Sequence, residues 1–479
     1  MQRSFSQAVA AFCCLAFSLC ILSGCKEESV PPVSSDIRQS EDGTYSYSDI
    51  PTVSDDTSHF SFVSSQPDTP KEPNSDPSVS SPPISDGTSA FPGSDSSSDE
   101  QFRLDTLYPT DRPFTPVSQE RKWFYRNLTQ HQKQLYEIID RAVITMQSGK
   151  IALGACSYPD LALVYTAVKS DHPEYFWLPT GYIYELVNGQ MYIAFDYEKD
   201  QYKIHYPYTR EERDALIPQL RQILEQAAAI LKPDMSEYDR ALALHDWLCA
   251  RLTYDEKTAA GATDHPEAFT IASLLDGAAV CEGYARSYQL LLYYAGLENA
   301  LVNGRVESTG HMWNMVKIDG NWYHTDATWN DSGDQGLHTY FNLTDAAIVS
   351  DHTIDPDYDT LSYDDLADSR SFNFRLPACR AISANFFALN GTLISGDNAF
   401  SRVVTEALIQ AAREGRRSCE FGFGDTYPIQ FTSSHELLQK LADQQCVQKA
   451  NEQLPAGKQL PSSISCNGII GSKGFALSW

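Results

Sequence analysis

Three residues in the middle of the chain have the side-chain types that catalysis by a thiol requires. Cys281 lies in GAAVCEGYARSY (277–288), His311 begins HMWNMVKI, and Asp326 lies in NWYHTDATW. A cysteine nucleophile needs an imidazole that takes the thiol proton and a carboxylate that fixes the imidazole's tautomer and orientation. Free cysteines are usually small buried apolar residues, so the elements that hold these side chains must decide between the two interpretations.

The residues after Cys281 predict a helix that begins at this cysteine. An apolar stripe repeats at helical spacing: Tyr284, Ala285, Tyr288, Leu291 and Leu292. Gly296 is a natural C-terminal cap. Unpaired N–H groups and the dipole at a helix N-terminus favour a thiolate, although the charge of Glu282 opposes this effect. The position of Cys281 is therefore compatible with a nucleophile, but alone it is a weak indication.

Asp319-Gly320 predicts a two-residue β-hairpin loop between the strands that carry the other two residues. With this loop, Trp313 faces Asp326, and His311 faces Thr328. His311 and Asp326 are then diagonal neighbours on one face, with Cα atoms about 7–8 Å apart, within reach of an imidazole and a carboxylate. A three-residue loop would place Asp326 on the opposite face, so the pairing depends on the register.

Two further histidines compete with His311 for a functional role. His324 lies on the same face of the hairpin, opposite Met315, and is the second candidate for the base. His245 falls on the apolar face of a helix predicted from Ser236 and is expected to be a core histidine with its hydrogen bonds satisfied. Cys249, on the same helix, is expected to fill the core.

The stretches AAVCEGYARSYQLLLYYAGL and HMWNMVKIDGNWYHTDATWND closely resemble the core of the transglutaminase-like superfamily, specifically its bacterial extracytoplasmic members. The resemblance covers roughly residues 236–331. It implies that Cys281 is the nucleophile, His311 the general base and acid, and Asp326 the orienting group. Many members have alanine where this chain has Met312, which the predicted register points away from the other three residues.

The resemblance also implies a side chain upstream of the cysteine that helps to bind the oxyanion. Tyr254 is the best candidate, although a packed strand aromatic explains it equally well. The backbone N–H of Cys281 is a natural second donor. Trp313 is a candidate wall of the site, whereas Asn314 points to the opposite face and is expected to be structural.

The predicted fold class is α+β, with a papain-like or transglutaminase-like core in which the helix carrying Cys281 packs on an antiparallel sheet. This core is expected at residues 233–355. Small α/β units are expected on either side, at 116–232 and 356–479. The C-terminal unit shows no recognisable chemistry.

The N-terminal unit is predicted to begin with one helix over 118–147. Three strands follow in GYIYELV, QMYIAFDY and YKIHYPY, and a capping box at Thr209 and Glu212 starts a helix that reaches about Leu231. Pro218 is expected to kink this helix. An aromatic cluster in between is either a ligand platform or, as we favour, a core patch: Tyr175, Phe176 and Trp177.

The N-terminal 25 residues have the features of a secretory signal, with Arg3 followed by a short apolar run. The run ends in LSGC, which resembles a bacterial lipoprotein signal and makes Cys25 the predicted lipidation site; a plain signal peptide is the alternative. Residues 26–115 are predicted to be a disordered tether, since 26–100 contain 21 serines, 15 acidic residues and only 3 basic ones. The predicted location is the outer face of the bacterial cell membrane.

Charge and cysteine spacing limit the partners that we expect. The formal net charge of −27 argues against a nucleic-acid partner. It also gives no attraction to anionic lipid, so membrane attachment would come through the lipid anchor alone. The six cysteines of the globular part other than Cys281 fit no zinc pattern, and we expect neither a metal nor a cofactor.

The function predicted from these features is that of a surface-anchored thiol enzyme that transfers acyl groups through a thioester. Hydrolysis of an amide in a protein or a cell-wall peptide is the preferred reaction. Transfer of the acyl group to an amine, as a transglutaminase does, is the alternative within the enzyme class. The alternative from another class is a non-catalytic lipoprotein that binds a peptide or a glycan.

Overall fold

The computed structural model describes residue 107 and residues 113–199, 202–331, 337–355, 374–427, 431, 433–461, 463–467 and 473–479. The predicted signal at 1–25, including Cys25, and nearly all of the predicted tether lie outside these residues. In the described part, no helix is both long and apolar enough to cross a membrane.

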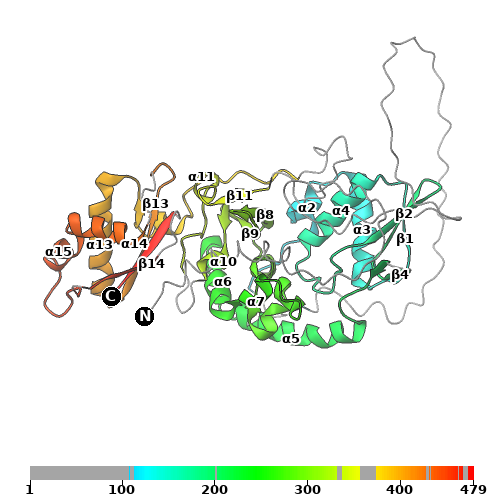
Figure 1. Ribbon diagram of the computed structural model, residues 1–479, viewed down its shortest axis with the longest axis horizontal. Coiled ribbons are helices and arrows are strands. Elements are labelled where there is room, and N and C mark those ends of the chain that lie inside the picture. Colours follow the sequence, from blue (N-terminus) through cyan, green and yellow to red (C-terminus); the bar gives the residue numbers. More distant parts are fainter. Residues whose placement is uncertain are drawn as a thin grey trace, which may run out of the picture.

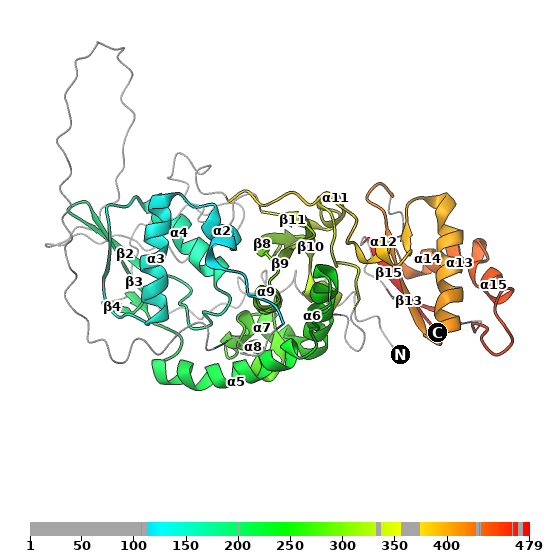
Figure 2. The same ribbon diagram turned by 180° about the vertical axis from the view of Figure 1, so that it is seen from behind.

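The helices and strands form three groups that lie in a row along the longest axis of the molecule (Figure 1). The group that carries Cys281 lies in the middle, with the N-terminal elements on one side and the C-terminal elements on the other. The view from behind shows the same order, and helix α5 runs along one edge from the N-terminal group to the middle group (Figure 2). The mixed architecture agrees with the predicted α+β class.

The N-terminal group combines helices with a small antiparallel sheet. Its helices are η3 (Gln119–Arg121), α2 (Trp123–Arg126), α3 (Gln130–Ile144), α4 (Tyr158–Asp171) and α5 (Arg210–Ala228). Its strands are β1 (Ile151–Gly154), β2 (Ile183–Val187), β3 (Gln190–Ala194), β4 (Tyr197–Lys199) and β5 (Tyr202–Ile204). Strands β1, β3 and β2 form one sheet in this order, and β4 pairs with β5.

The single helix predicted over 118–147 is wrong, because the chain forms three helical pieces there. The buried carboxylate of Asp171 accepts the backbone N–H groups of Phe124 and Tyr125, 3.2 and 2.6 Å away, and so caps the start of α2. Thr129 then begins α3 with a complete capping box to Gln132. The apolar periodicity that suggested a helix belongs to α3 alone.

Two other local predictions for this group, the capping box of α5 and the buried aromatic cluster, are confirmed. Thr209 and Glu212 form the predicted capping box of α5, although the helix ends at Ala228 rather than near Leu231, and Pro218 lies inside it. The aromatic cluster is buried and belongs to the core: Tyr175, Phe176 and Trp177.

The middle group is built around a four-stranded antiparallel sheet in the order β10-β9-β8-β11. The sheet strands are β8 (Asn299–Val306), β9 (Thr309–Ile318), β10 (Asn321–Thr325) and β11 (His352–Ile354). The helices are α6 (Glu237–Arg251), α7 (Glu256–Ala259), η4 (Pro266–Phe269), α8 (Ser273–Asp276), α9 (Cys281–Tyr294), α10 (Ala327–Asn330) and α11 (Asp345–Ile348). The short strands β6 (Thr253–Tyr254) and β7 (Ala278–Ala279) pair in parallel.

Helix α9 begins at Cys281, as predicted, and packs on β8 and β9. It ends in a Schellman motif, because the N–H groups of Gly296 and Leu297 donate to the carbonyls of Tyr293 and Leu292. Gly296 has the positive φ, +74°, that this motif requires. Residues 283–294 are all buried, so α9 is a central helix enclosed on every side and not an amphipathic helix with one buried stripe.

The predicted hairpin register is confirmed from Asn321↔Ile318 to Thr325↔Asn314. Asp319 and Gly320 have φ values of +48° and +83°, as a two-residue type I′ turn requires. The ladder ends at Thr325, however, and the chain turns into α10, so neither the predicted pair of Trp313 with Asp326 nor that of His311 with Thr328 forms.

The C-terminal group has its own sheet and its own core. Its strands follow the order β12-β13-β15-β14 and are β12 (Leu393–Ile394), β13 (Ser418–Phe423), β14 (Ser465–Asn467) and β15 (Gly474–Ser478). Its helices are α12 (Phe386–Leu389), α13 (Asp397–Glu414), α14 (Ser434–Asp443) and α15 (Cys446–Asn451). By contrast, one cluster of buried side chains runs through the N-terminal and middle groups, across the predicted boundary at 232–233.

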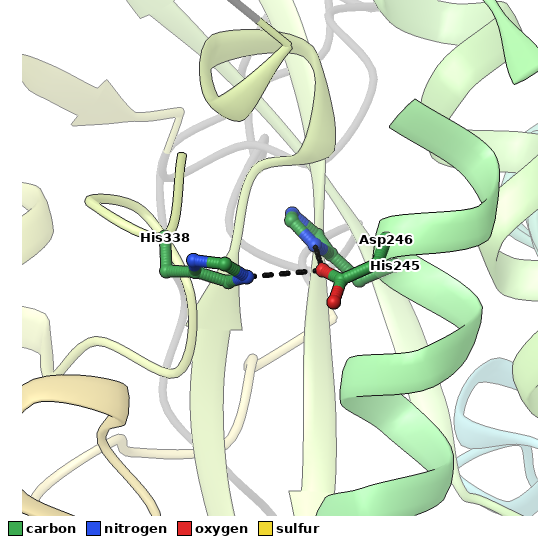
Figure 3. Close-up of side chains that lie close together, drawn as sticks. All are labelled: His245, Asp246 and His338. Atoms are coloured by element: carbon green, nitrogen blue, oxygen red, sulfur yellow. Dashed lines mark hydrogen bonds and ion pairs between the residues drawn. The ribbon is translucent and has the colours of Figure 1, made fainter. Parts of the chain in front are cut away.

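His338 links the middle group to the C-terminal group. Its Nε2 lies 3.0 Å from Asp246 Oδ1 on α6, and its Nδ1 lies 3.0 Å from Glu420 Oε1 on β13. Figure 3 shows the contact with Asp246, and the ring of Phe386 stacks on that of His338 with centroids 3.9 Å apart. Burial lowers the pKa of His338, but the hydrogen bonds to the two carboxylates outweigh burial and raise it to about 9. His338 is therefore an imidazolium that holds two carboxylates from different groups.

This link predicts a stability difference that depends on pH. A folded-state pKa of about 9, above the ordinary value near 6.5, means that protonated His338 stabilises the fold fully below about pH 6.5. The contribution is lost as the pH rises through 9. His338→Gln should therefore lower the free energy of unfolding by about 2 kcal/mol at pH 6 and by much less at pH 9.5. Urea unfolding at both pH values measures this, with His435→Gln, at an exposed position on α14, as the control; equal losses at both pH values would contradict it.

Gly304 predicts a second effect on stability. A Cβ at this position on β8 would lie 2.2 Å from the carbonyl oxygen of Thr353 on β11 and 2.4 Å from the indole of Trp313 on β9. Gly304→Ala should therefore destabilise the protein by about 1–3 kcal/mol, because the indole or β11 must move. Gly310→Ala is the matched control in β9, since nothing lies within 4 Å of its added Cβ. A urea midpoint for Gly304→Ala equal to that of the control would contradict the prediction.

Candidate functional site

Cys281 occupies the first position of α9 and is partly exposed. The chain reaches it through Gly277, whose φ of +84° ends α8, and through the two residues of β7. The N–H of Val280 donates to the carbonyl of Ala268, 3.0 Å away, and this contact fixes where α9 starts. A Cβ on Gly283 would lie 2.2 Å from the same carbonyl oxygen. Glycine after Cys-Glu is therefore required by the close approach of η4 to α9.

His311 connects the thiol to a carboxylate. Its Nε2 lies 2.6 Å from Asp326 Oδ2, and the side chain of Cys281 lies close enough to the ring to raise the pKa of His311. Because Nε2 is used by Asp326, the nitrogen that serves the thiol is Nδ1. The structure thus brings the three predicted residues together in the order Cys281, His311, Asp326.

The environment of His311 favours its protonated form. Burial lowers the pKa of His311, but the charge of Asp326 and the hydrogen bonds to Asp326 and Cys281 outweigh burial and raise it well above the usual range. Trp313, two residues along β9, stacks on the imidazole with centroids 5.8 Å apart and planes 23° apart. The ring is therefore held in one orientation, and the site is suited to accept a proton from a thiol.

Asp326 is completely buried at the point where β10 ends. Its Oδ1 accepts the backbone N–H of Trp329, 3.1 Å away, as the N-cap of α10. Burial alone would raise the pKa of Asp326, but the adjacent His311 and a second histidine, His352, hold it far below its usual range. Asp326 is therefore a permanent carboxylate, fixed by the helix that it caps.

The two further candidates, Tyr254 and Trp313, have different surroundings. Tyr254 on β6 pairs with Ala279 on β7. Because Ala279 lies two residues before Cys281, Tyr254 is next to the start of α9. Trp313 is 1% exposed and donates its Nε1–H to His324 Nδ1, 3.0 Å away. It lies behind His311, where it fixes the imidazole and does not form an open wall. Asn314 donates to the carbonyl of Ala285 on α9 and is structural, as predicted.

His324, the second candidate base, has both ring nitrogens engaged. Nδ1 accepts from Trp313, so Nε2 carries the proton and donates to Asp345 Oδ1, 3.1 Å away. Burial lowers the pKa of His324, in agreement with a neutral ring. The carboxylate of Asp345 also accepts the backbone N–H of Cys379. These bonds account for the cluster of His324, Asp345 and Cys379 without an ion.

His245 is buried and hydrogen-bonded, as expected for a core histidine. The N–H of Tyr340 donates to Asn330 Oδ1, so the Nδ2 group of Asn330 is what faces His245 Nε2, 2.9 Å away. Nε2 therefore accepts, and Nδ1–H donates to Asp246 Oδ1 (2.9 Å). With Nδ1 protonated, His245 has no free nitrogen for a metal ion, although His245, Asp246 and His338 lie close together (Figure 3). Cys249 is buried beside it, as predicted.

His352 was not predicted from the sequence, but it contacts Asp326 directly. Its Nε2 lies 3.1 Å from Asp326 Oδ2. His352 lies on β11, the short edge strand that pairs with β8 after a long connection. A strand of three residues has no periodicity from which pairing could be predicted, so the only signal was the presence of another histidine downstream.

Part of the chain is similar to a known family. Residues 225–327 match the model of a family described as the transglutaminase-like superfamily. A search of curated proteins finds no match. Among solved structures, a transglutaminase is 17% identical over 33% of this chain and 46% of its own, with a TM-score of 0.23. A proposed cysteine protease from Cytophaga hutchinsonii is 16% identical over 29% and 52%, with a TM-score of 0.19.

This chain therefore spans about half the length of each of the two solved structures. The family match covers all of α9, the hairpin of β9 and β10, and the N-cap of α10, which carry Cys281, His311 and Asp326. Residues 225–327 form a domain of the transglutaminase-like superfamily.

Proposed function

We propose that this protein is a thiol enzyme that transfers acyl groups from amides through a thioester on Cys281 and passes them to water. The observation that carries the proposal is the position of the His311 imidazole, which hydrogen-bonds with buried Asp326 and lies close enough to Cys281 for that side chain to raise its pKa. Cys281 is a free thiol and is partly exposed, so a substrate carbonyl has access to it.

The geometry suits a sequence of four proton and bond changes. His311 Nδ1 takes the thiol proton, and the sulfur of Cys281 attacks the carbonyl carbon of the amide. The tetrahedral intermediate then collapses as His311 gives the proton to the leaving amine, which leaves a thioester. Water attacks the thioester while His311 takes a proton from it. The carboxylic acid leaves, and the proton returns to the sulfur.

Two groups are placed to stabilise the oxyanion of that intermediate. The N–H of Cys281 is in the first turn of α9, where helical geometry provides no intrahelical acceptor. Tyr254 lies on the adjacent strand β6 and is the proposed second donor. Trp313 supports the site through His311, because it is buried behind that ring.

Solvent access favours water as the acyl acceptor. Transfer to an amine requires that a site exclude water from the thioester, since water otherwise hydrolyses it. The side chain of Cys281 is partly exposed at the start of α9. Hydrolysis of a protein or a cell-wall peptide is therefore the proposed reaction.

The proposed location is the outer face of the bacterial membrane, with the enzyme anchored through Cys25. The apolar run and LSGC at the N-terminus support a lipoprotein signal, and the acidic, serine-rich segment after it supports a tether. The net negative charge gives no attraction to anionic lipid, so the acyl chain would provide the attachment.

Alkylation tests whether His311 activates Cys281. Iodoacetamide should modify Cys281 at pH 7 at least about tenfold faster in the wild type than in His311→Ala, because the imidazole takes the thiol proton. Peptide mass spectrometry measures the rate at each cysteine. Cys156 is the internal control, since burial raises the pKa of its thiol to about 11 and it lies on another group of elements. Equal rates at Cys281 in the two proteins would contradict the proposal.

Peptide turnover tests the reaction itself. A glutamine-containing peptide incubated with a fluorescent primary amine should be hydrolysed without capture of the amine, and Cys281→Ala should lower the rate at least about a thousandfold. Incorporation of the amine would instead identify a transglutaminase. Peptide or glycan binding that is equal in wild type and Cys281→Ala, with no turnover, would identify a binding protein.

A further inference from the structure

The carboxylate of Asp326 is shared between two histidines. Oδ2 lies 2.6 Å from His311 Nε2 and 3.1 Å from His352 Nε2, and Oδ1 accepts the backbone N–H of Trp329. Asp326 and the side chain of His352 are both inaccessible to solvent. The single carboxylate oxygen that orients the candidate base therefore has a second, equally buried partner.

His352 is itself held firmly. Its Nδ1 lies 2.6 Å from Asp351 Oδ1, and the hydroxyl of Tyr340 donates to Asp351 Oδ2, also at 2.6 Å. The rings of Trp313 and Trp329 surround the imidazole, with centroids 5.2 and 4.9 Å away. A chain of hydrogen bonds thus runs from His311, the ring next to Cys281, through Asp326, His352 and Asp351 to Tyr340.

The partners of His352 define its protonation. Each ring nitrogen faces a carboxylate oxygen, and a carboxylate only accepts, so both nitrogens must carry protons. Burial lowers the pKa of His352, but the hydrogen bonds to Asp326 and Asp351 outweigh burial and raise it. His352 is therefore a cation, with its ring centroid 5.4 Å from that of His311.

We propose that His352 is a positioning residue of the site: it fixes the Asp326 carboxylate for His311 and places a positive charge that limits how strongly His311 holds its proton. The position of the imidazole depends on the hydrogen bond to Asp326. The charge matters because a cation near His311 destabilises the imidazolium. This inference rests on the proposed function, since it assigns His352 to the proton transfer between Cys281 and His311.

The charge effect has a definite direction. Removal of the cation stabilises the protonated states of the Cys281 and His311 pair, so both limbs of a pH profile move to higher pH. His352→Gln removes the charge but keeps a hydrogen-bond donor near Asp326. The expected shift is about one pH unit, because the two rings are within the range at which neighbouring charges act strongly.

The pH profile of Cys281 alkylation tests the inference without a substrate. The acid limb of iodoacetamide modification should move up by about one pH unit in His352→Gln. In the double variant His352→Gln/Asp351→Asn, which removes the cation and its anion together, it should move up by clearly less. His352→Phe, which has no donor, should in addition lower the plateau rate at least several-fold. An unchanged profile in His352→Gln would overturn the proposal, since a merely structural histidine would alter stability and not this profile.

Two further measurements test the role of His352 if the variants unfold, and separate it from the proposed function. If the variants unfold, 15N NMR of the wild-type histidine rings still applies: both nitrogens of His352 should be protonated at pH 7, and a lone pair on Nε2 would overturn the proposal. Peptide turnover by the wild type separates the two hypotheses. Absence of turnover together with the expected alkylation shift would contradict the proposed function alone, whereas normal turnover with no shift would contradict only the role of His352.

Discussion

The site depends on one completely buried carboxylate, that of Asp326. A buried charge without partners would cost several kcal/mol, so the fold must supply hydrogen-bond donors from all sides. It does so with the imidazole of His311, the imidazole of His352 and the N–H of Trp329. These donors come from β9, β11 and α10. The hydrogen bonds to Asp326 therefore connect the strand that carries His311, the edge strand of the sheet and the helix that follows β10.

The parts of the site that could be predicted are those that depend on local sequence signals. The distance between His311 and Asp326 follows from a two-residue turn at Asp319-Gly320, because that turn fixes the register of the hairpin. The start of α9 at Cys281 likewise follows from local signals, the apolar repeat and Gly296. His352 could not be found in this way, since β11 joins the sheet beside β8 only after the chain has left β10 and passed α10 and α11.

The predictions that failed outside the site also failed because of contacts between residues that are distant in sequence. The separate start of α2 depends on Asp171, which caps the first turn of α2 from the end of α4. The amphipathic stripe predicted for α9 underestimated its burial, because helices and strands from several parts of the chain enclose it. Apolar periodicity identifies one face of a helix that is buried, whereas the tertiary structure determines how many faces are buried.

A histidine between two carboxylates occurs three times in the middle group, and one of the three links this group to the C-terminal group. His352 lies between Asp326 and Asp351, His265 between Asp255 and Asp276, and His338 between Asp246 and Glu420. In each case the carboxylates raise the pKa of the imidazole above its usual value against the opposing effect of burial. A chain with a net charge of −27 must bring acidic groups together when it folds, and an imidazolium between two of them converts that repulsion into attraction. Because folding raises these pKa values, the three histidines bind more protons in the folded protein than in the unfolded chain, so their contribution to stability decreases as the pH rises. The arrangement that orients Asp326, a protonated histidine between two carboxylates, thus also helps to stabilise the fold of an acidic chain.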